Sequence, residues 1–410
     1  MLGIVIIGAG HAGVQLAASL RENGYRDSIR LLSGDPDFPY HKPPLSKSFM
    51  VTEDAALQPL RGEAFYAQNA IDLKLGVDVA RIDRNGKSVI CADGATIGYD
   101  KLVLATGTRA RNITVPGADL PQVFELRTAT DARRMRDALP AMRRVVVIGG
   151  GFIGLEAAAM LSARGVQVDV IELAPRLLGR ATSGAVASAI ADHLTSIGIR
   201  LHLNQSITAI VAQDGAVLGV QLGDTTLPAD HVLVGVGAIP MDDLAQDAGL
   251  STDNGIVVDG YLGTGDPDIF AIGDCVSFPQ IHLSRHARLE SVQNATDQAR
   301  ALALTLTGQP CRYTALPWFW SDIGTLKLQI AGLSEQPDQL IPTHDSHGIL
   351  KSVYHLKQGK LIACETLNSA GEHMLSRRMI AEGLTPSLAE LATGDLKEIK
   401  LAYQRLSNVY

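Results

Sequence analysis

Cysteine is scarce in this sequence, and its spacing argues against two common kinds of site. The cysteines are Cys91, Cys275, Cys311 and Cys364, and no two of them form a C-x-x-C pair. Disulfide frameworks and zinc sites need closely spaced cysteines or accompanying histidines. We therefore expect no disulfide framework and no metal site, and a reducing, cytoplasmic setting fits best.

The sequence also lacks an excess of basic residues and a membrane-spanning run. Its formal net charge is −7 at pH 7, whereas nucleic-acid-binding domains are usually basic. Residues 1–20 are nearly uncharged, but glycines interrupt them and no basic region precedes them. We therefore expect neither a signal peptide nor a membrane helix there, and no nucleic-acid or membrane partner.

Apolar residues are plentiful enough to build several cores. Of the 410 residues, 46% are hydrophobic and 19% are charged. A chain of this length exceeds what one hydrophobic core usually supports. We therefore expect a multidomain globular protein.

One sequence pattern occurs twice. An aliphatic run at residues 4–7 leads into a glycine-rich turn, and a similar run at 145–148 leads into another. The turns contain Gly8, Gly10, Ala12 and Gly13 in the first copy and Gly149, Gly151, Phe152, Ile153 and Gly154 in the second. Each copy also closes on a similar segment, at residues 100–107 and 230–237. This repetition indicates duplicated α/β architecture, with a buried strand, a turn and a helix in each copy.

Such turns suit nucleotide binding. The glycines let the backbone approach a pyrophosphate, and the following helix offers free N–H groups and the positive end of its dipole. One copy alone is as often structural as functional, but two copies after aliphatic runs indicate two nucleotide sites.

An acidic residue after the next strand identifies the nucleotide. Glu172 ends the strand-like residues 168–172, and a carboxylate there accepts hydrogen bonds from ribose hydroxyls and repels a 2′-phosphate. The second copy therefore favours NADH over NADPH, although Glu172 could be a solvated strand end. In the first copy the corresponding residues are Ser33, Gly34 and Asp35, so the carboxylate comes late.

Turn residues suggest the domain boundaries. Pro116-Gly117 and Ile239-Pro240 bracket the second copy as an insertion. We predict a first domain at residues 1–112 that resumes at 241–316, with an inserted domain at 113–240. Strand-like segments at 325–331, 348–355 and 360–367 predict a third, α+β domain at 317–410.

Motifs over nearly the whole chain resemble the putidaredoxin reductase family. Besides both turns they are KPPLSK at 42–47, ATG at 105–107, FAIGDC at 270–275, ESVQNA at 290–295 and PWFWSD at 317–322. This family comprises FAD-dependent, NADH-oxidising reductases of the glutathione reductase fold. The resemblance implies FAD in the first copy, NADH in the second, and a [2Fe–2S] ferredoxin that serves a cytochrome P450 or a ring dioxygenase.

The resemblance also implies roles for individual residues. It places Asp274 against the flavin's ribityl chain, and the helix start at Glu290, Ser291 and Val292 at the flavin's pyrimidine end. Val79 matches an adenine contact and Arg127 a flavin-nucleotide contact. The further candidate nucleotide contacts are Lys42, Lys47, Ala105, Thr106, Gly107, Gly237 and Trp320. The sequence departs from the family where Gly34 replaces an acidic residue, so Asp35, Ser33 or a water must substitute.

Lys47 and Glu156 resemble the family's catalytic ion pair beside flavin N5. The alternative is a solvated lysine and an exposed helical carboxylate. No cysteine lies between Phe38 and Phe65, where related dithiol reductases carry their redox cysteine. Electrons should therefore leave the flavin singly, to an outside acceptor.

A locally basic region suits an acidic ferredoxin, although charge clusters are often merely solvated. Its residues are Arg285, His286, Arg288, Arg300 and Arg312. Two other functions stay open: an NADH-responsive flavoprotein resembling apoptosis-inducing factor, and an NADH oxidase that makes peroxide. The chain could be a monomer or a homodimer.

Overall fold

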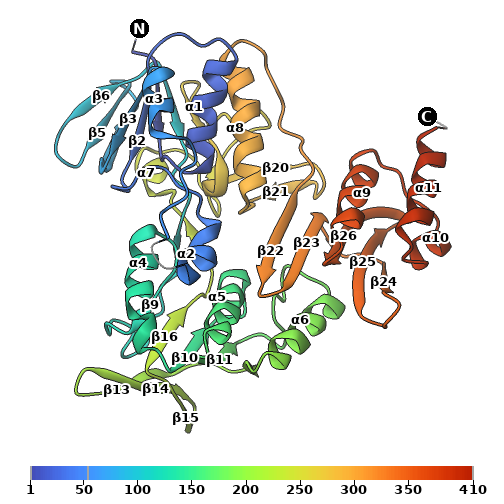
Figure 1. Cartoon of the computed structure of the whole chain (residues 1–410). Helices are drawn as coiled ribbons and strands as arrows, with labels where there is room; N and C mark the ends of the chain where they lie inside the picture. The colour runs from blue at the N-terminus through green and yellow to red at the C-terminus, as the bar shows by residue number, and fades with distance from the viewer. Residues whose placement is uncertain (1, 53–54, 409–410) are drawn as a thin grey trace. The chain divides into compact units, whose positions relative to one another are not determined.

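The computed structural model describes residues 2–52 and 55–408 (Figure 1). The chain forms two compact units, each built from separate segments. The first unit contains Met1–Lys42, Ala56–Arg109 and Ala238–Pro317. The second unit contains Pro43–Ala55, Ala110–Gly237 and Trp318–Tyr410.

The first unit is built on a parallel sheet with strand order β19-β7-β1-β2-β3. Its strands are β1 (Ile4–Ile7), β2 (Ile29–Ser33), β3 (Ile71–Leu75), β7 (Lys101–Leu104) and β19 (Ile269–Ala271). Every residue of β1 is buried, as expected of a central parallel strand with both faces covered. The chain runs outward from β1 in opposite directions, so β1 and β7 form a topological switch point, where ligands of such sheets bind.

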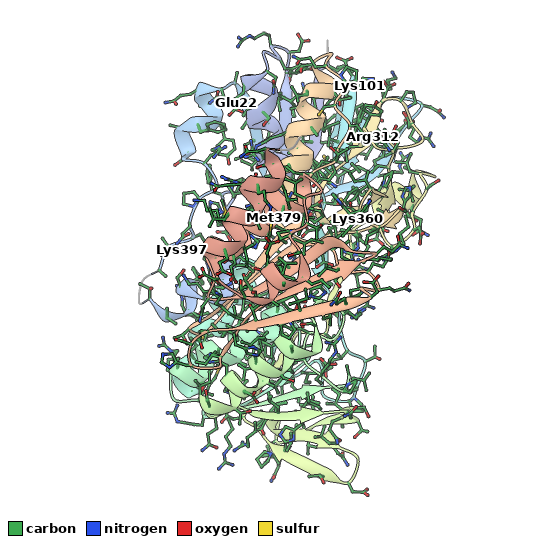
Figure 2. All side chains as sticks on the ribbon, turned by 90° about the vertical axis from the view of Figure 1, so that its right-hand side faces the viewer. Glu22, Lys101, Arg312, Lys360, Met379 and Lys397 are labelled. Atoms are coloured by element: carbon green, nitrogen blue, oxygen red, sulfur yellow. The ribbon has the colours of Figure 1, made fainter. Side chains whose placement is uncertain are left out.

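Helices α1 (His11–Glu22) and α8 (Val292–Leu306) pack against each other beside this sheet. Lys101, labelled in Figure 2, joins β7 to the segment before β19, because its Nζ lies 2.7 Å from Oδ1 of Asp268. The unit's other elements are α3 (Glu63–Gln68), β4 (Val79–Asp83), β5 (Ser88–Cys91), β6 (Thr96–Gly98), β8 (Thr108–Ala110), β17 (Ala238–Pro240), α7 (Asp243–Asp247), β18 (Ile256–Val257), the 3-10 helix η3 (Gly273–Cys275), β20 (Val276–Gln280) and β21 (Arg285–Ala287).

The second unit repeats this arrangement. Its parallel sheet has the order β12-β11-β10-β16-β9, so β10, β11, β12 and β16 correspond to β1, β2, β3 and β7. The elements are β9 (Val123–Phe124), α4 (Ala129–Ala138), the 3-10 helix η2 (Leu139–Ala141), β10 (Arg144–Ile148), α5 (Phe152–Ala163), β11 (Gln167–Glu172), α6 (Gly184–Ser196), β12 (Arg200–Leu203) and β16 (His231–Val234). The duplication expected from the sequence is confirmed, down to the strand order.

An antiparallel meander follows the third sheet strand in both units. In the first unit it is β4-β5-β6, and in the second it is β13 (Ala209–Gln213), β14 (Ala216–Leu222) and β15 (Thr225–Pro228). The second unit also contains η1 (Pro43–Ser46) and α2 (Ser48–Val51).

The C-terminal part of the second unit is an antiparallel sheet with the order β22-β23-β26-β25-β24, followed by helices. The strands are β22 (Trp318–Ile323), β23 (Leu326–Gly332), β24 (Gln339–His344), β25 (Leu350–Lys357) and β26 (Lys360–Leu367), and the helices are α9 (Ala370–Ala381), α10 (Leu388–Ala392) and α11 (Leu396–Ser407). The predicted strands correspond to β23, β25 and β26, whereas β22 and β24 were missed. The α+β character of this region is confirmed, and the predicted domain boundaries stay a prediction.

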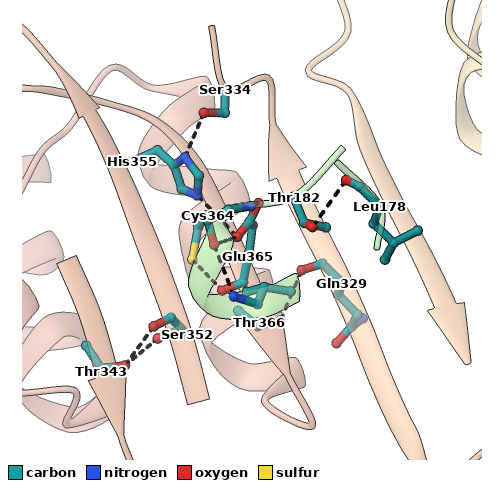
Figure 3. A network of polar contacts seen from close by, with 12 residues as sticks. Leu178, Thr182, Gln329, Ser334, Thr343, Ser352, His355, Cys364, Glu365 and Thr366 are labelled. Carbon is teal, nitrogen blue, oxygen red and sulfur yellow. Dashed lines mark hydrogen bonds and ion pairs between the residues drawn. The ribbon is translucent and has the colours of Figure 1, made fainter. Parts of the chain in front are cut away.

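A buried carboxylate joins α6 to this sheet (Figure 3). Glu365 on β26 is 1% exposed. It accepts hydrogen bonds from the backbone N–H of Ser183 at 2.8 Å and from the Ser183 hydroxyl at 2.5 Å. Ser183 is the N-cap of α6, and His355 Nε2 lies 3.3 Å from the same carboxylate. The first turn of α6 is therefore held by a side chain of the C-terminal sheet.

Across the described ranges, the helices are too short or too polar to cross a membrane. Within the same ranges, histidine, cysteine and acidic side chains nowhere gather in a group of three or more that could hold a metal ion.

Candidate functional site

The first glycine turn follows β1 and opens α1. Gly8 has a φ of +107°, and a Cβ there would overlap the carbonyl oxygen of Ala105. A Cβ on Gly13 would overlap the carbonyl oxygen of Gly8. The outer two glycines are therefore required by the packing of the turn itself.

The middle glycine has a different role. Gly10 is the N-cap of α1, and apart from its chain neighbours no atom of the described residues lies within 4 Å of the position a Cβ would take. The turn is thus open above Gly10, where the backbone N–H groups of the first turn of α1 are available. This is the shape that a diphosphate needs, and it fits FAD.

Segments from neighbouring strands surround this turn. Thr106, between Ala105 and Gly107 after β7, donates a hydrogen bond to the carbonyl of Met241 at 2.5 Å. After β19, a Cβ on Gly273 would lie 3.1 Å from the Cβ of Ala12. The structure therefore brings the motifs at residues 8–13, 105–107 and 273–275 together at one edge of the sheet.

The motif at residues 290–295, which opens α8, lies at the same edge of the sheet. Gln298 on α8 accepts a hydrogen bond from the N–H of Gly273 at 2.7 Å, and the carbonyl of Asp274 accepts one from Arg288 at 3.2 Å. Ser291 caps α8 and accepts from the N–H of Asn294 at 3.0 Å. Glu290 and Val292 flank this cap, so Asp274 and the start of α8 lie in one constellation.

The predicted ribose acid of the first unit is engaged within its own loop. One oxygen of Asp35 accepts from the N–H of Asp37 at 3.0 Å, and the other accepts from the Tyr40 hydroxyl at 2.8 Å. Lys42 lies with its Nζ 6.0 Å from the Tyr40 ring. Val79, the predicted adenine contact, begins β4.

The second glycine turn repeats the first. Gly149 has a φ of +107°, and a Cβ there would overlap the carbonyl oxygen of Gly235. A Cβ on Gly154 would lie 2.5 Å from the carbonyl oxygen of Gly149. Above Gly151, the N-cap of α5, the nearest described atom beyond its chain neighbours is the carbonyl oxygen of Gly235, 3.8 Å from the Cβ position. The same open cradle therefore occurs in the second unit, and it fits a second dinucleotide.

Glu172 lies beside this cradle and is not a solvated strand end. Its Oε2 accepts from the N–H of Gly150 at 2.7 Å, and its Oε1 accepts from the N–H of Ala174 at 2.7 Å. An ionised carboxylate offers about four acceptor positions, so about two stay available for ribose hydroxyls. Gly237, after β16, has a φ of +106°.

Lys47 and Glu156 meet in the second unit. Lys47 Nζ lies 2.7 Å from Glu156 Oε2. The same oxygen accepts from the Ser46 hydroxyl at 2.7 Å, and Oε1 accepts from the Ser321 hydroxyl at 2.7 Å and the N–H of Asp322 at 3.3 Å. Glu156 is 7% exposed and Lys47 is 25% exposed. The ion pair expected from the sequence is present and buried on its acidic side.

Sequence reasoning missed the two serines of this network. Ser46 and Ser321 belong to the motifs at residues 42–47 and 317–322, so the signal was their position inside motifs already singled out. Serine side chains are short, so the backbone fixes where their hydroxyls lie. Both hydroxyls donate to the Glu156 carboxylate.

The other predicted contacts in the second unit lie on separate elements. The backbone N–H of Arg127 donates to Asp131 at the start of α4. On β22, Trp320 packs against Trp318 with 5.5 Å between ring centroids. On α5, Phe152 packs against Phe319 at 4.5 Å, and Ile153 is 43% exposed.

The cysteines are free thiols. Cys275 is fully buried, with Sγ 3.3 Å from the carbonyl of Ile272. Burial raises the pKa of Cys275, and also those of Cys91 and Cys364. These three cysteines are therefore protonated at neutral pH and are poor nucleophiles.

The predicted basic region is partly neutralised. Arg288 pairs with Glu290 at 2.5 Å, and Arg300 pairs with Asp297 at 2.8 Å. Arg285 and His286 lie on β21, and Arg312 is labelled in Figure 2.

Comparisons with known proteins match the chain to two families. Residues 3–299 match the family described as pyridine nucleotide-disulphide oxidoreductase, and residues 318–400 match the family described as reductase C-terminal. The chain is 41% identical to rhodocoxin reductase of Rhodococcus erythropolis, over 97% of this chain and 94% of that protein. It is 40% identical to a rubredoxin-NAD(+) reductase of Pseudomonas putida, over 90% and 96%.

Solved structures resemble it over nearly their full length. The ferredoxin reductase for the CYP199A2 system from Rhodopseudomonas palustris has a TM-score of 0.93 at 43% identity, over 97% of this chain and 99% of that chain. The reductase in a covalent putidaredoxin reductase-putidaredoxin complex has a TM-score of 0.93 at 37% identity, over 98% and 99%. The chain therefore belongs to the pyridine nucleotide-disulphide oxidoreductases, among the reductases that resemble putidaredoxin reductase.

Proposed function

We propose that this chain is an FAD-dependent NADH:ferredoxin oxidoreductase. It takes a hydride from NADH and passes single electrons to a [2Fe–2S] ferredoxin that serves a cytochrome P450 or a ring dioxygenase. The observation that carries the proposal is the pair of equivalent cradles, each open above its middle glycine at the end of a central strand.

FAD binds the first cradle and supplies the hydride-accepting ring. Gly8, Gly10 and Gly13 shape the diphosphate site, and Asp274 and the N-terminus of α8 hold the flavin side. The positive end of the α8 dipole favours added electron density on the ring that it faces.

NADH binds the second cradle. The turn at Gly149, Gly151 and Gly154 accepts the diphosphate, and Glu172 accepts hydrogen bonds from the adenosine ribose. A 2′-phosphate would meet the Glu172 carboxylate, which favours NADH over NADPH.

The Lys47–Glu156 pair serves hydride transfer. Glu156 lies on α5, the helix that opens with the NADH cradle, and its four donors fix the carboxylate in one position. The carboxylate in turn fixes the Lys47 ammonium, which stays partly exposed for contact with a cofactor.

Electrons leave the flavin without a cysteine relay. Cys275 is buried and protonated, and residues 38–65 contain no cysteine. An outside one-electron acceptor is therefore needed. The region at Arg285, His286 and Arg312 would attract an acidic ferredoxin, and reduction rates that do not change with ionic strength would argue against that docking role.

The experiment measures NADH-dependent cytochrome c reduction by the purified yellow protein, with a [2Fe–2S] ferredoxin, with rubredoxin, or with neither. Reduction that requires the [2Fe–2S] ferredoxin supports the proposal. A requirement for rubredoxin would support an NADH-dependent reductase but would show that its acceptor is rubredoxin and not a [2Fe–2S] ferredoxin. Oxygen consumption undiminished without either protein would indicate an NADH oxidase, and sluggish reduction with a stable long-wavelength band would indicate an NADH-responsive sensor.

Two further properties belong to the proposal. The protein works in the cytoplasm, where its cysteines stay reduced. It is a monomer or a homodimer, which light scattering with and without NADH would decide.

A further inference from the structure

The two cradles differ in where a ribose carboxylate could come from. Strand registers make Ser33 the counterpart of Glu172, because Ile7 pairs with Leu32 and Ile148 pairs with Ile171. Ser33 carries no charge, and its hydroxyl donates to the carbonyl of Asp35 at 3.2 Å. The end of β2 therefore lacks the acidic residue that β11 has.

Of the two residues after Ser33, only Asp35 carries a carboxylate. Gly34 has no side chain, and both carboxylate oxygens of Asp35 accept hydrogen bonds from Asp37 and Tyr40. Those bonds fix the Asp35 carboxylate within the loop, two residues beyond the position that corresponds to Glu172.

A carboxylate from the next loop occupies this place. A Cβ on Gly34 would overlap Oδ1 of Asp78 and lie 3.4 Å from its Cγ. The loop is aligned by backbone hydrogen bonds, from Val77 N–H to the carbonyl of Ser33 at 2.8 Å and from Gly76 N–H to the carbonyl of Asp35 at 3.3 Å. Gly34 thus leaves the space that the Asp78 carboxylate needs at the end of β2.

Asp78 is free to accept a ligand. It is exposed, and within residues 2–52 and 55–408 its carboxylate has no hydrogen bond or ion pair. Its backbone carbonyl accepts from the N–H of Ala92 at 2.8 Å, and it directly precedes Val79 on β4. Its backbone is therefore fixed while its side chain is available.

We infer that Asp78 supplies the carboxylate that accepts hydrogen bonds from the adenosine ribose of FAD. This inference rests on the proposed function, since it needs FAD in the first cradle. It assigns the acidic ligand to the loop between β3 and β4, whereas the second unit carries its ligand on β11.

The test measures how fast the purified holoprotein releases FAD on dilution, by the fluorescence of free flavin. Losing one hydrogen bond to a charged acceptor should weaken FAD binding by about 10- to 100-fold in Asp78→Ala and Asp78→Asn. The matched control is Asp72→Asn, an exposed aspartate of β3 that pairs with Lys74 at 3.1 Å, and it should retain FAD as the wild type does.

Two further arms make the assignment specific. Gly34→Glu combined with Asp78→Ala moves the carboxylate onto the end of β2 and should restore much of the affinity. An FAD analogue with a 2′,3′-dideoxyadenosine should bind the wild type and Asp78→Asn equally well, because it has no hydroxyl to donate.

Wild-type FAD retention in both Asp78 variants would overturn the inference. If those variants also reduce ferredoxin with NADH at the wild-type rate, the proposed function stands without it. A wild-type protein that binds no FAD would remove the proposed function first.

Discussion

Replacing Glu156 tests whether the buried network serves electron transfer or only the fold. Glu156→Ala removes the acceptor of Lys47, Ser46, Ser321 and the N–H of Asp322. We expect flavin reduction by NADH to slow by about 100-fold, because displacement of a positioned group by about 1 Å costs that much in rate. FAD retention should change little, because Glu156 lies on α5 and contributes nothing to the glycine turn at residues 8–13.

The same variant should also lose stability. Removing one partner of a buried ion pair costs about 3–5 kcal/mol. The lower end applies here, because Lys47 is a quarter exposed and can be hydrated. The two serine hydroxyls add to the cost, since a buried donor left without a partner loses about 1–3 kcal/mol.

Lys47→Ala separates the two effects. Glu156 keeps three of its four donors in that variant, so the loss of stability should be smaller while flavin reduction is still slow. Lys74→Ala is the control, because Lys74 and Asp72 form an exposed pair whose contribution should be no more than about 1 kcal/mol.

The assay is stopped-flow reduction of the bound flavin at saturating NADH, with urea unfolding followed in parallel. Wild-type reduction rates in both Glu156→Ala and Lys47→Ala would refute the catalytic assignment. A loss of stability without slower flavin reduction would mean that the hydrogen-bond network around Glu156 serves only the fold.

Three further substitutions have separate expected results. Gly10→Val should abolish FAD binding and leave the circular dichroism spectrum unchanged, because φ at Gly10 is −76° and its side-chain position is open. Glu365→Ala should lower the free energy of unfolding by about 2–4 kcal/mol in urea titrations, because the N-cap of α6 loses its buried acceptor. Burial alone would raise the pKa of Asp169, but hydrogen bonds from Arg200 and His202 lower it below its usual range. The resulting stabilisation is complete above about pH 4 and is lost as the pH falls through the lowered pKa. The free energy of unfolding of Asp169→Asn should therefore depend less on pH between pH 2 and 6 than that of the wild type.

The duplicated architecture was predictable because its signal is local. Each copy places an aliphatic run, a glycine turn and a helix within about 20 residues, and the burial of both central strands follows from that composition. The strand β24 was missed because Pro342 breaks its pattern. Proline is tolerated there since β24 is an edge strand of its sheet, and edge position is not visible in a sequence.

The grouping of the C-terminal sheet was beyond sequence reasoning for a similar reason. A third domain was predicted from a change of pattern after Pro317, and residues 318–400 match a family of their own. In the structure, residues 318–408 group with the second unit, so the predicted boundary stays a prediction. Glu365 and Ser183 are far apart in sequence, and each alone is an ordinary strand or cap residue. Only their meeting shows that α6 is held by the C-terminal sheet.

The two residues proposed as ribose acids, Glu172 and Asp78, differ in how far a sequence motif can point to them. Glu172 lies on the strand that follows its glycine turn, so a search along one strand, turn and helix finds it. The same search in the first copy reaches Gly34 and Asp35, and Asp35 accepts hydrogen bonds from Asp37 and Tyr40 of its own loop. Asp78 lies in the loop after the next strand, and parallel pairing of β2 with β3 brings that loop beside Gly34. When a side chain from the segment after a neighbouring strand takes the place of the expected acid, the sequence shows only a glycine at the expected position. Gly34 is such a glycine, because the Asp78 side chain lies where its own side chain would be.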